Sequence, residues 1–358
     1  MFRILILFVS IATLQVHASP TEAERIKRTY ELSAETWALK LKLAQTPAEK
    51  QALWDKRPDA KKTAADTWRL IGPSLAQDWT IPYATFFLTL TRNLVTTDSR
   101  GIATPDFIPQ RERIIEVFSK NHLQKPGIGA FAIALAESGD PQAIGTLEKI
   151  INTNPDNVTK GVAALGASML LKNLGDATEV MKKRLKYLRL AIIHAADQTI
   201  GDTSIADIAS DELFVIRYLS KGRQAPDFSG TDVASRVIRL SNFKGKITLV
   251  LFWDAKTTET DKVIQLTNQM VDKYLDKPVQ ILGITPESLT RIRELQADGS
   301  IKWNNIIDPA EKISGEYKVA NRPLVIILDE KGTIQYTGLP GSFAELTVDA
   351  LLAGEAPK

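Results

Sequence analysis

The chain is predicted to fold as two domains, an all-helical domain followed by an α/β domain. From about residue 22 to residue 219, apolar residues recur at helical spacing. Glycine and proline then cluster in residues 221–228, and the apolar runs that follow are typical of strands. A chain of 358 residues is long enough for two cores of ordinary size. We predict a helical domain over 19–220 and an α/β domain over 221–358.

The helical domain is predicted from nine amphipathic stretches separated by turn residues. Proline and glycine mark turns near residues 58, 101, 126 and 155. The predicted helices cover residues 23–43, 60–71, 82–94, 109–118, 127–137, 141–151, 159–171, 177–196 and 204–219.

Two helix–turn–helix units within this domain are similar to each other. Each begins with a helix rich in alanine and glycine, and Gly161 of the second unit corresponds to Gly129 of the first. The offset between these two glycines is in the range of helical-pair repeats, and small residues on the first helix of each unit would allow close packing against the next unit. A helical-repeat array and a plain helical bundle both remain open.

The α/β domain is predicted from apolar runs that alternate with amphipathic helices. Strands are expected at 235–240, 247–253 and 279–285, and helices at 258–275 and 289–296. A hairpin of strands 324–328 and 333–336 turns through residues 329–332, where Gly332 supplies positive φ. A last helix is expected over 343–352. The predicted order is β-β-α-β-α-β-β-α.

Four segments of this domain, taken together and in order, are similar to segments of a known protein family. They are Ala-Pro-Asp-Phe at 225–228, Leu-Ser-Asn-Phe-Lys-Gly-Lys at 240–246, the apolar run 248–253, and residues 322–332, which begin with Arg-Pro. In this order they resemble the TlpA-like and redoxin (AhpC/TSA) branch of the thioredoxin superfamily. The resemblance implies a thioredoxin-like α/β domain. The helical half is similar to the helical regions attached to TlpA-like domains in some exported bacterial proteins.

The residues that carry this family's chemistry are missing. Aligned on Phe252-Trp253, the two cysteines of the family's C-x-x-C motif correspond to Thr257 and Thr260, and the chain has no cysteine. Thiol–disulfide exchange needs a thiolate and a sulfur that it attacks, and a threonine hydroxyl supplies neither near neutral pH. We therefore predict no catalytic residue at this degenerate site.

A binding groove is the candidate site that the resemblance implies. In the family, the backbone before a cis-proline pairs with an extended peptide, and this pairing needs no cysteine. The candidate groove residues are Trp253, Thr257, Arg322 and Pro323. The alternative is that Pro323 only shapes the start of a strand.

No cofactor or metal is expected. Glu259 and Asp261 are two residues apart, so on a helix they point about 200° apart and cannot share a metal. They are better suited to the first turn of a helix, where Thr258 and Asp261 have the spacing of a capping box. His122 and His194 lack a paired ligand spacing, and nucleotide-binding and hydrolase motifs are absent.

Residues 1–18 have the pattern of a secretory signal. Arg3 precedes an apolar run over residues 4–14, and Val16 and Ala18 have the small size that a signal peptidase reads. The run is shorter than the roughly 20 residues that span a bilayer. We expect a periplasmic or extracellular protein without a membrane anchor. The net charge of +3 gives no reason to expect nucleic acid as a partner.

These observations favour an exported, non-catalytic binding or scaffolding protein whose partner is an extended peptide or another exported protein. The alternative is a thiol-disulfide oxidoreductase or antioxidant, as the family fold implies. A third possibility is a structural role of the helical half alone.

The signal pattern predicts that the mature protein begins at Ser19, because cleavage after Ala18 fits the residue sizes. N-terminal sequencing of the secreted protein checks this. A mature protein that retains residues 2–14 would contradict it.

Overall fold

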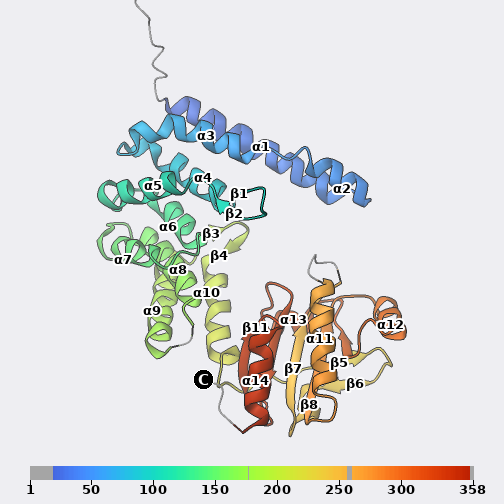
Figure 1. Ribbon diagram of the computed structural model, residues 1–358. Coiled ribbons are helices and arrows are strands. Elements are labelled where there is room, and N and C mark those ends of the chain that lie inside the picture. Colours follow the sequence, from blue (N-terminus) through green and yellow to red (C-terminus); the bar gives the residue numbers. More distant parts are fainter. Residues whose placement is uncertain (1–18, 176, 256–259, 355–358) are drawn as a thin grey trace, which may run out of the picture. The chain divides into compact units, whose positions relative to one another are not determined.

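The computed structural model describes residues 19–175, 177–255 and 260–354, and the chain divides into two compact units between Asp207 and Ile208 (Figure 1). The two units are described separately. The predicted signal segment lies outside the described residues. Within these ranges, no helix is both long and apolar enough to cross a membrane.

The N-terminal unit is helical, which confirms the predicted fold class. Its α-helices are α1 (Pro20–Leu43), α2 (Pro47–Trp54), α3 (Ala60–Ile71), α4 (Ile81–Thr91), α5 (Ile108–Asn121), α6 (Ile128–Glu137), α7 (Ala143–Thr153), α8 (Asn157–Lys172) and α9 (Thr178–Ala195). The 3-10 helices η1 (Gly72–Ser74) and η2 (Asp78–Thr80) precede α4. Two short hairpins pair β1 (Val95–Thr97) with β2 (Ala103–Pro105), and β3 (Thr199–Ile200) with β4 (Thr203–Ser204).

The helix α2 and both hairpins are not predicted from the sequence. With eight residues, α2 is too short to show a clear helical period. Every residue of β1 and β2 is exposed, so this hairpin has no apolar alternation. These elements are set by capping and turns, which periodicity does not detect.

Small residues allow α6 and α8 of the two similar units to pack closely, as predicted, and also allow α8 to pack closely against α9. A Cβ atom added to Gly161 of α8 would lie 2.7 Å from the Cβ atom of Ala195 in α9. On the other side of α8, a Cβ atom at Gly166 would lie 3.1 Å from that of Ala136 and 3.2 Å from the carbonyl oxygen of Ala132. The helix backbones therefore approach each other at positions where larger side chains do not fit.

Gly161→Ala should destabilise the protein by about 1–3 kcal/mol, because the added methyl group overlaps Ala195. Gly145→Ala, in α7, is the matched control because no atom lies within 4 Å of its added Cβ. That change should stabilise by about 0.5–1 kcal/mol through helix propensity. Urea unfolding followed by circular dichroism measures both, and equal stability of the two variants would contradict the close approach.

The C-terminal unit begins inside a helix and not at the glycine–proline break. Helix α10 (Ile205–Phe214) continues into a π-helical segment, η3 (Val215–Leu219). The side chain of Leu219 is buried in a core of this unit together with Phe228 and Val250. The Asp211 carboxylate is 2.6 Å from the Lys318 ammonium group. Residues on the N-terminal side of the predicted boundary at residue 220 therefore pack with the C-terminal unit.

The C-terminal unit is a seven-stranded mixed sheet with helices on both faces, a thioredoxin-like arrangement. Along the sheet, the order is β11-β10-β7-β8-β9-β5-β6, with β7, β8 and β9 parallel. The strands are β5 (Ser229–Asp232), β6 (Val237–Arg239), β7 (Ile247–Phe252), β8 (Val279–Thr285), β9 (Asn304–Ile307), β10 (Leu324–Leu328) and β11 (Ile334–Gly338). The helices are η4 (Leu240–Phe243), α11 (Thr260–Lys273), α12 (Leu289–Ala297), α13 (Lys312–Glu316) and α14 (Ser342–Leu352).

Strand β7 lies inside the sheet, and all six of its residues are buried. Its side chains alternate between two cores, as the two-residue period of a strand requires. Leu249 and Leu251 pack into the core under α11 and α14, whereas Val250 and Phe252 pack into the core on the opposite face. This explains the continuous apolar run by which the sequence predicts the strand.

The predicted element order omits β5, β9 and α13. Strand β5 reads Ser-Gly-Thr-Asp and β9 begins with two asparagines, so neither has the apolar signature of a strand. Both are nevertheless held by the ladder, because β5 pairs with β9 and β9 pairs with β8. The sheet therefore extends further than the sequence pattern indicates.

Helices α11 and α14 lie side by side on one face of the sheet (Figure 1) and are joined by a polar cluster. The Lys273 ammonium group donates to the Asp349 carboxylate at 2.7 Å, and the Tyr274 hydroxyl donates to the same carboxylate at 2.9 Å. The hydrogen bond from Lys273 holds the pKa of Asp349 below its usual value. Burial, followed by the bond to Asp349, raises the pKa of Tyr274 to about 12.

The pKa of Asp349 is lower in the folded protein than in the unfolded chain. The ionised carboxylate of Asp349 therefore stabilises the fold at pH values above its pKa in the unfolded chain, which is about 3.9. This stabilisation is lost as the pH falls through the depressed folded value. At pH 7, Asp349→Asn should cost about 0.5–1 kcal/mol, since this pair is partly exposed. The cost should shrink as the pH falls below the unfolded value toward the depressed folded pKa of Asp349.

Denaturant unfolding from pH 3 to pH 7 tests this dependence. Asp276→Asn is the control, because Asp276 is exposed and makes no ion pair within the described ranges. A pH-independent difference between wild type and Asp349→Asn would contradict the pairing.

Candidate functional site

The candidate site lies where β7 ends and α11 begins. Strand β7 is followed by Trp253, whose backbone N–H donates to the Ile284 carbonyl oxygen of β8 at 3.1 Å. The Trp253 side chain is 1% exposed. It packs in the core beneath the site and does not line a surface groove. Thr257 lies outside the described residues. Thr260, the second degenerate position, is the first residue of α11.

A buried amide fixes the orientation of Trp253. The Asn305 Oδ1 atom accepts hydrogen bonds from two indole groups, Trp253 Nε1 at 2.8 Å and Trp303 Nε1 at 3.1 Å. The Asn305 Nδ2 atom donates to the Trp303 carbonyl oxygen at 3.0 Å. A Cβ atom at Gly283 would lie 2.0 Å from Asn305 Oδ1, so the network requires glycine there.

A second buried group holds the loop after Trp253. Glu287 follows β8 and is 8% exposed, and its Oε1 atom accepts a hydrogen bond from the Ala255 backbone N–H at 3.2 Å. The hydroxyl of Thr260 donates to the Asp254 carbonyl oxygen at 3.1 Å. Both bonds fix the chain on either side of the degenerate segment. The predicted capping box of Thr258 and Asp261, with Glu259 between them, falls partly outside the described residues.

The other side of the site is formed by Arg322 and Pro323. The peptide bond between them is cis, which confirms the cis-proline that the resemblance implies. The antiparallel register pairs Leu324 with Phe252, so Pro323 lies next to Trp253 where the two strands meet. The Arg322 side chain is 13% exposed, and its guanidinium group is 2.8 Å from the Glu311 carboxylate.

The structure thus brings Trp253, Arg322 and Pro323 to one end of the sheet. Glu287, Asn305 and Glu311 are not predicted from the sequence. Glu287 could have been noticed as a carboxylate just after an apolar strand. Asn305 and Glu311 have no comparable signal, because their partners are 52 and 11 residues away in the sequence.

The described residues offer few groups for chemistry at this site or elsewhere. They contain no group of three or more His, Asp or Glu side chains that could hold a metal. His122 is fully buried in the helical unit, and its Nε2 atom is 2.7 Å from the Leu75 carbonyl oxygen. His194 lies in the last turn of α9.

Residues 221–337 match the AhpC/TSA family. The thiol-disulfide oxidoreductase ResA of Bacillus thuringiensis (strain Al Hakam) is 26% identical over 155 residues, which are 43% of this chain and 87% of that protein. The thioredoxin-like protein YneN of Bacillus subtilis (strain 168) is 29% identical over 120 residues, 33% of this chain and 70% of that protein.

These matches relate residues 221–337 to the redoxin/thioredoxin superfamily. The thioredoxin-like unit is also similar to solved structures. The thioredoxin domain of thiol-disulfide oxidoreductase BVU-2223 from Bacteroides vulgatus has 25% identity and a TM-score of 0.34, covering 37% of this chain and 98% of that chain. A putative thiol:disulfide interchange protein DsbE from Chlorobium tepidum has 22% identity and a TM-score of 0.35, with the same coverage.

Asn305→Ala should destabilise the thioredoxin-like unit by about 3 kcal/mol, because it leaves two buried indole N–H groups without an acceptor. Asn304→Ala is the matched control, since Asn304 is the exposed neighbour in the same strand. The control should change stability by less than about 0.5 kcal/mol. Urea unfolding followed by tryptophan fluorescence measures both. Equal losses would contradict the role of the Asn305 amide.

Proposed function

We propose that the protein is an exported, non-catalytic binding protein whose thioredoxin-like unit holds an extended peptide at the cis-Pro323 site. The absence of any cysteine argues against thiol chemistry, and the intact backbone arrangement around Pro323 argues for a retained binding role. The signal-like segment 1–18 supports export.

The observation that carries the proposal is the free backbone of Arg322. Within the described ranges, neither its N–H nor its carbonyl group takes part in a hydrogen bond. Strand β10 begins two residues later and is paired on both sides, with β11 and β7, so a peptide that pairs with Arg322 would lie just beyond the end of these ladders. Unpaired backbone groups next to a strand favour this mode of recognition.

The side chain of Arg322 prepares this backbone for binding. Its guanidinium group is bound to Glu311, so the residue is held before a peptide arrives and less conformational entropy is lost on binding. The Trp253 and Asn305 network supports the neighbouring end of β7. Side-chain contacts therefore hold the chain on both sides of Pro323.

The alternative function is thiol-disulfide exchange, the activity in the name of the relative ResA. This chain has no thiol to act as nucleophile or leaving group. A shared fold does not transfer an activity when the reacting atoms are missing.

A matched pair of substitutions tests the binding proposal. Decapeptides are first selected from a random phage-displayed library on the immobilised full-length protein. They should bind Arg322→Ala within about threefold of wild type, because alanine keeps the backbone N–H group and only the contact that holds Arg322 to Glu311 is lost. Arg322→Pro removes that N–H, and binding should weaken about tenfold.

Circular dichroism confirms that both variants are folded. If the library yields no binding peptides, or if Arg322→Pro binds them as well as wild type does, the proposed peptide site is wrong.

The wild-type protein should show no insulin-reductase or peroxidase turnover above buffer, because it has no sulfur nucleophile. The double variant Thr257→Cys and Thr260→Cys restores the family spacing. It should form an internal disulfide and gain measurable dithiol reductase activity. Mass spectrometry after alkylation follows the disulfide, and turnover by the wild type would overturn the non-catalytic interpretation.

A further inference from the structure

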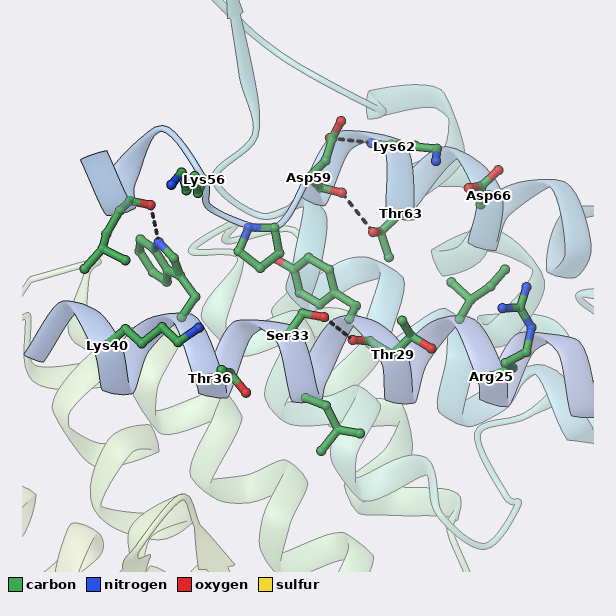
Figure 2. Close-up of a pocket in the computed structure, with 16 residues that line it drawn as sticks. Arg25, Thr29, Ser33, Thr36, Lys40, Lys56, Asp59, Lys62, Thr63 and Asp66 are labelled. Carbon is green, nitrogen blue, oxygen red and sulfur yellow. Dashed lines mark hydrogen bonds between the residues drawn. The ribbon is translucent and has the colours of Figure 1, made fainter. Parts of the chain in front are cut away.

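The helical unit has a groove between α1 on one side and α2 and α3 on the other, with a volume of about 830 Å³. Figure 2 shows that α1 forms one wall and that Asp59, Lys62 and Asp66 belong to the opposite wall. The groove side of α1 presents Arg25, Thr29, Ser33, Thr36 and Lys40, at spacings of three and four residues. A volume of this size is in the range of ligand sites.

The groove is already formed in the free protein. The indole N–H of Trp37 in α1 donates to the Leu53 carbonyl oxygen of α2 at 2.7 Å. The rings of Trp37 and Trp54 have centroids 5.5 Å apart, and the Arg57 guanidinium lies 5.5 Å from the Trp54 ring centroid. These contacts hold the C-terminal part of α1 against α2, while Ala23 and Ile26 pack the N-terminal part of α1 against the core of the unit.

An exposed apolar stripe forms the edge of the groove on α1. Leu32, Leu39 and Leu43 are 55%, 59% and 64% exposed. Their spacings of seven and four residues place them on one helix face. Leu32 also lines the groove, so the stripe and the groove form one continuous surface. Exposed apolar side chains that line up beside a groove favour an interaction site.

The surface is strongly basic. Residues 36–62 contain seven Lys and Arg and three Asp and Glu, a net charge of +4, whereas the whole chain carries +3. Lys40 and Lys56 line the groove and make no ion pair within the described ranges. The Asp59 carboxylate is already engaged, because it accepts the Lys62 backbone N–H at 2.8 Å and caps α3.

We infer that this groove is the docking site for an acidic amphipathic helix of another protein. The partner's apolar stripe would contact Leu32, Leu39 and Leu43, and its carboxylates would meet Lys40 and Lys56. From Arg25 to Lys40 the groove wall is about 24 Å long at 1.5 Å per residue, which matches a helix of about 16 residues. A concave site suits a helix laid in a groove better than a flat bilayer surface. This inference is independent of the cis-Pro323 site.

Fluorescence anisotropy with defined peptides tests the docking site on the full-length mature protein. The probe is a labelled helical peptide of the length that matches the groove wall, with leucine along one face and glutamate beside it. Two further peptides have lysine in place of glutamate, or the same composition in scrambled order. The acidic amphipathic peptide should bind at least about tenfold more tightly than either of them.

Single substitutions locate the binding. Lys40→Glu and Leu39→Ser should each weaken binding of the acidic peptide about tenfold or more. The matched controls, Lys149→Glu and Leu174→Ser, change an exposed lysine of α7 and an exposed leucine after α8. These should stay within about twofold of wild type. Equal binding of all three peptides, no saturable binding, or insensitivity to Lys40→Glu would overturn the inference.

Two further measurements distinguish the proposed helical partner from two other occupants of the groove, a membrane and a second copy of this chain. Co-sedimentation with phosphatidylglycerol vesicles that Lys40→Glu abolishes, without peptide binding, would assign the surface to a membrane and overturn the inference. Concentration-dependent dimerisation in sedimentation velocity, abolished by Leu39→Ser and without peptide binding, would assign it to a second copy and overturn it as well.

Discussion

Two indole N–H groups converge on one amide oxygen in the interior of the thioredoxin-like unit, and much of the candidate site is arranged around this contact. A buried donor without an acceptor costs about 1–3 kcal/mol. Asn305 avoids this cost for two donors at once, because its side-chain oxygen accepts from both indole groups. The absence of a side chain at Gly283 leaves room for its oxygen. Because Trp253 directly follows β7, its orientation determines where the chain leaves the sheet toward α11.

The site retains its supports although its reactive groups have been replaced. Glu287 holds the loop at Ala255, and Thr260 holds the start of α11 to Asp254. On the opposite side, Arg322 is bound to Glu311 beside the cis peptide bond. None of these contacts involves sulfur. The supports of this site therefore do not depend on thiols, which is why fold similarity and activity have to be argued separately.

The sequence predicts those parts of the molecule that are held by burial of apolar side chains. Strands β8 and β10 have the predicted bounds, because their apolar runs fill both faces of the sheet. Strands β5 and β9 escape prediction, since their polar residues are held by ladder bonds from neighbours far away in the sequence. At the site, Pro323 could be predicted from its motif. The burial of Trp253 and the roles of Asn305 and Glu287 depend on tertiary contacts that no local pattern encodes.

The burial of Leu219 has a consequence for how the thioredoxin-like unit can be isolated. The family match begins at residue 221, and a recombinant fragment cut there would lack Leu219 and the partly buried Phe214 and Val215. The fragment would open a hole beside Phe228 and expose apolar surface, which favours aggregation. A fragment that begins before Ile208 keeps these side chains, together with the Asp211 partner of Lys318. The end of the helical segment is thus a structural part of the domain that follows it.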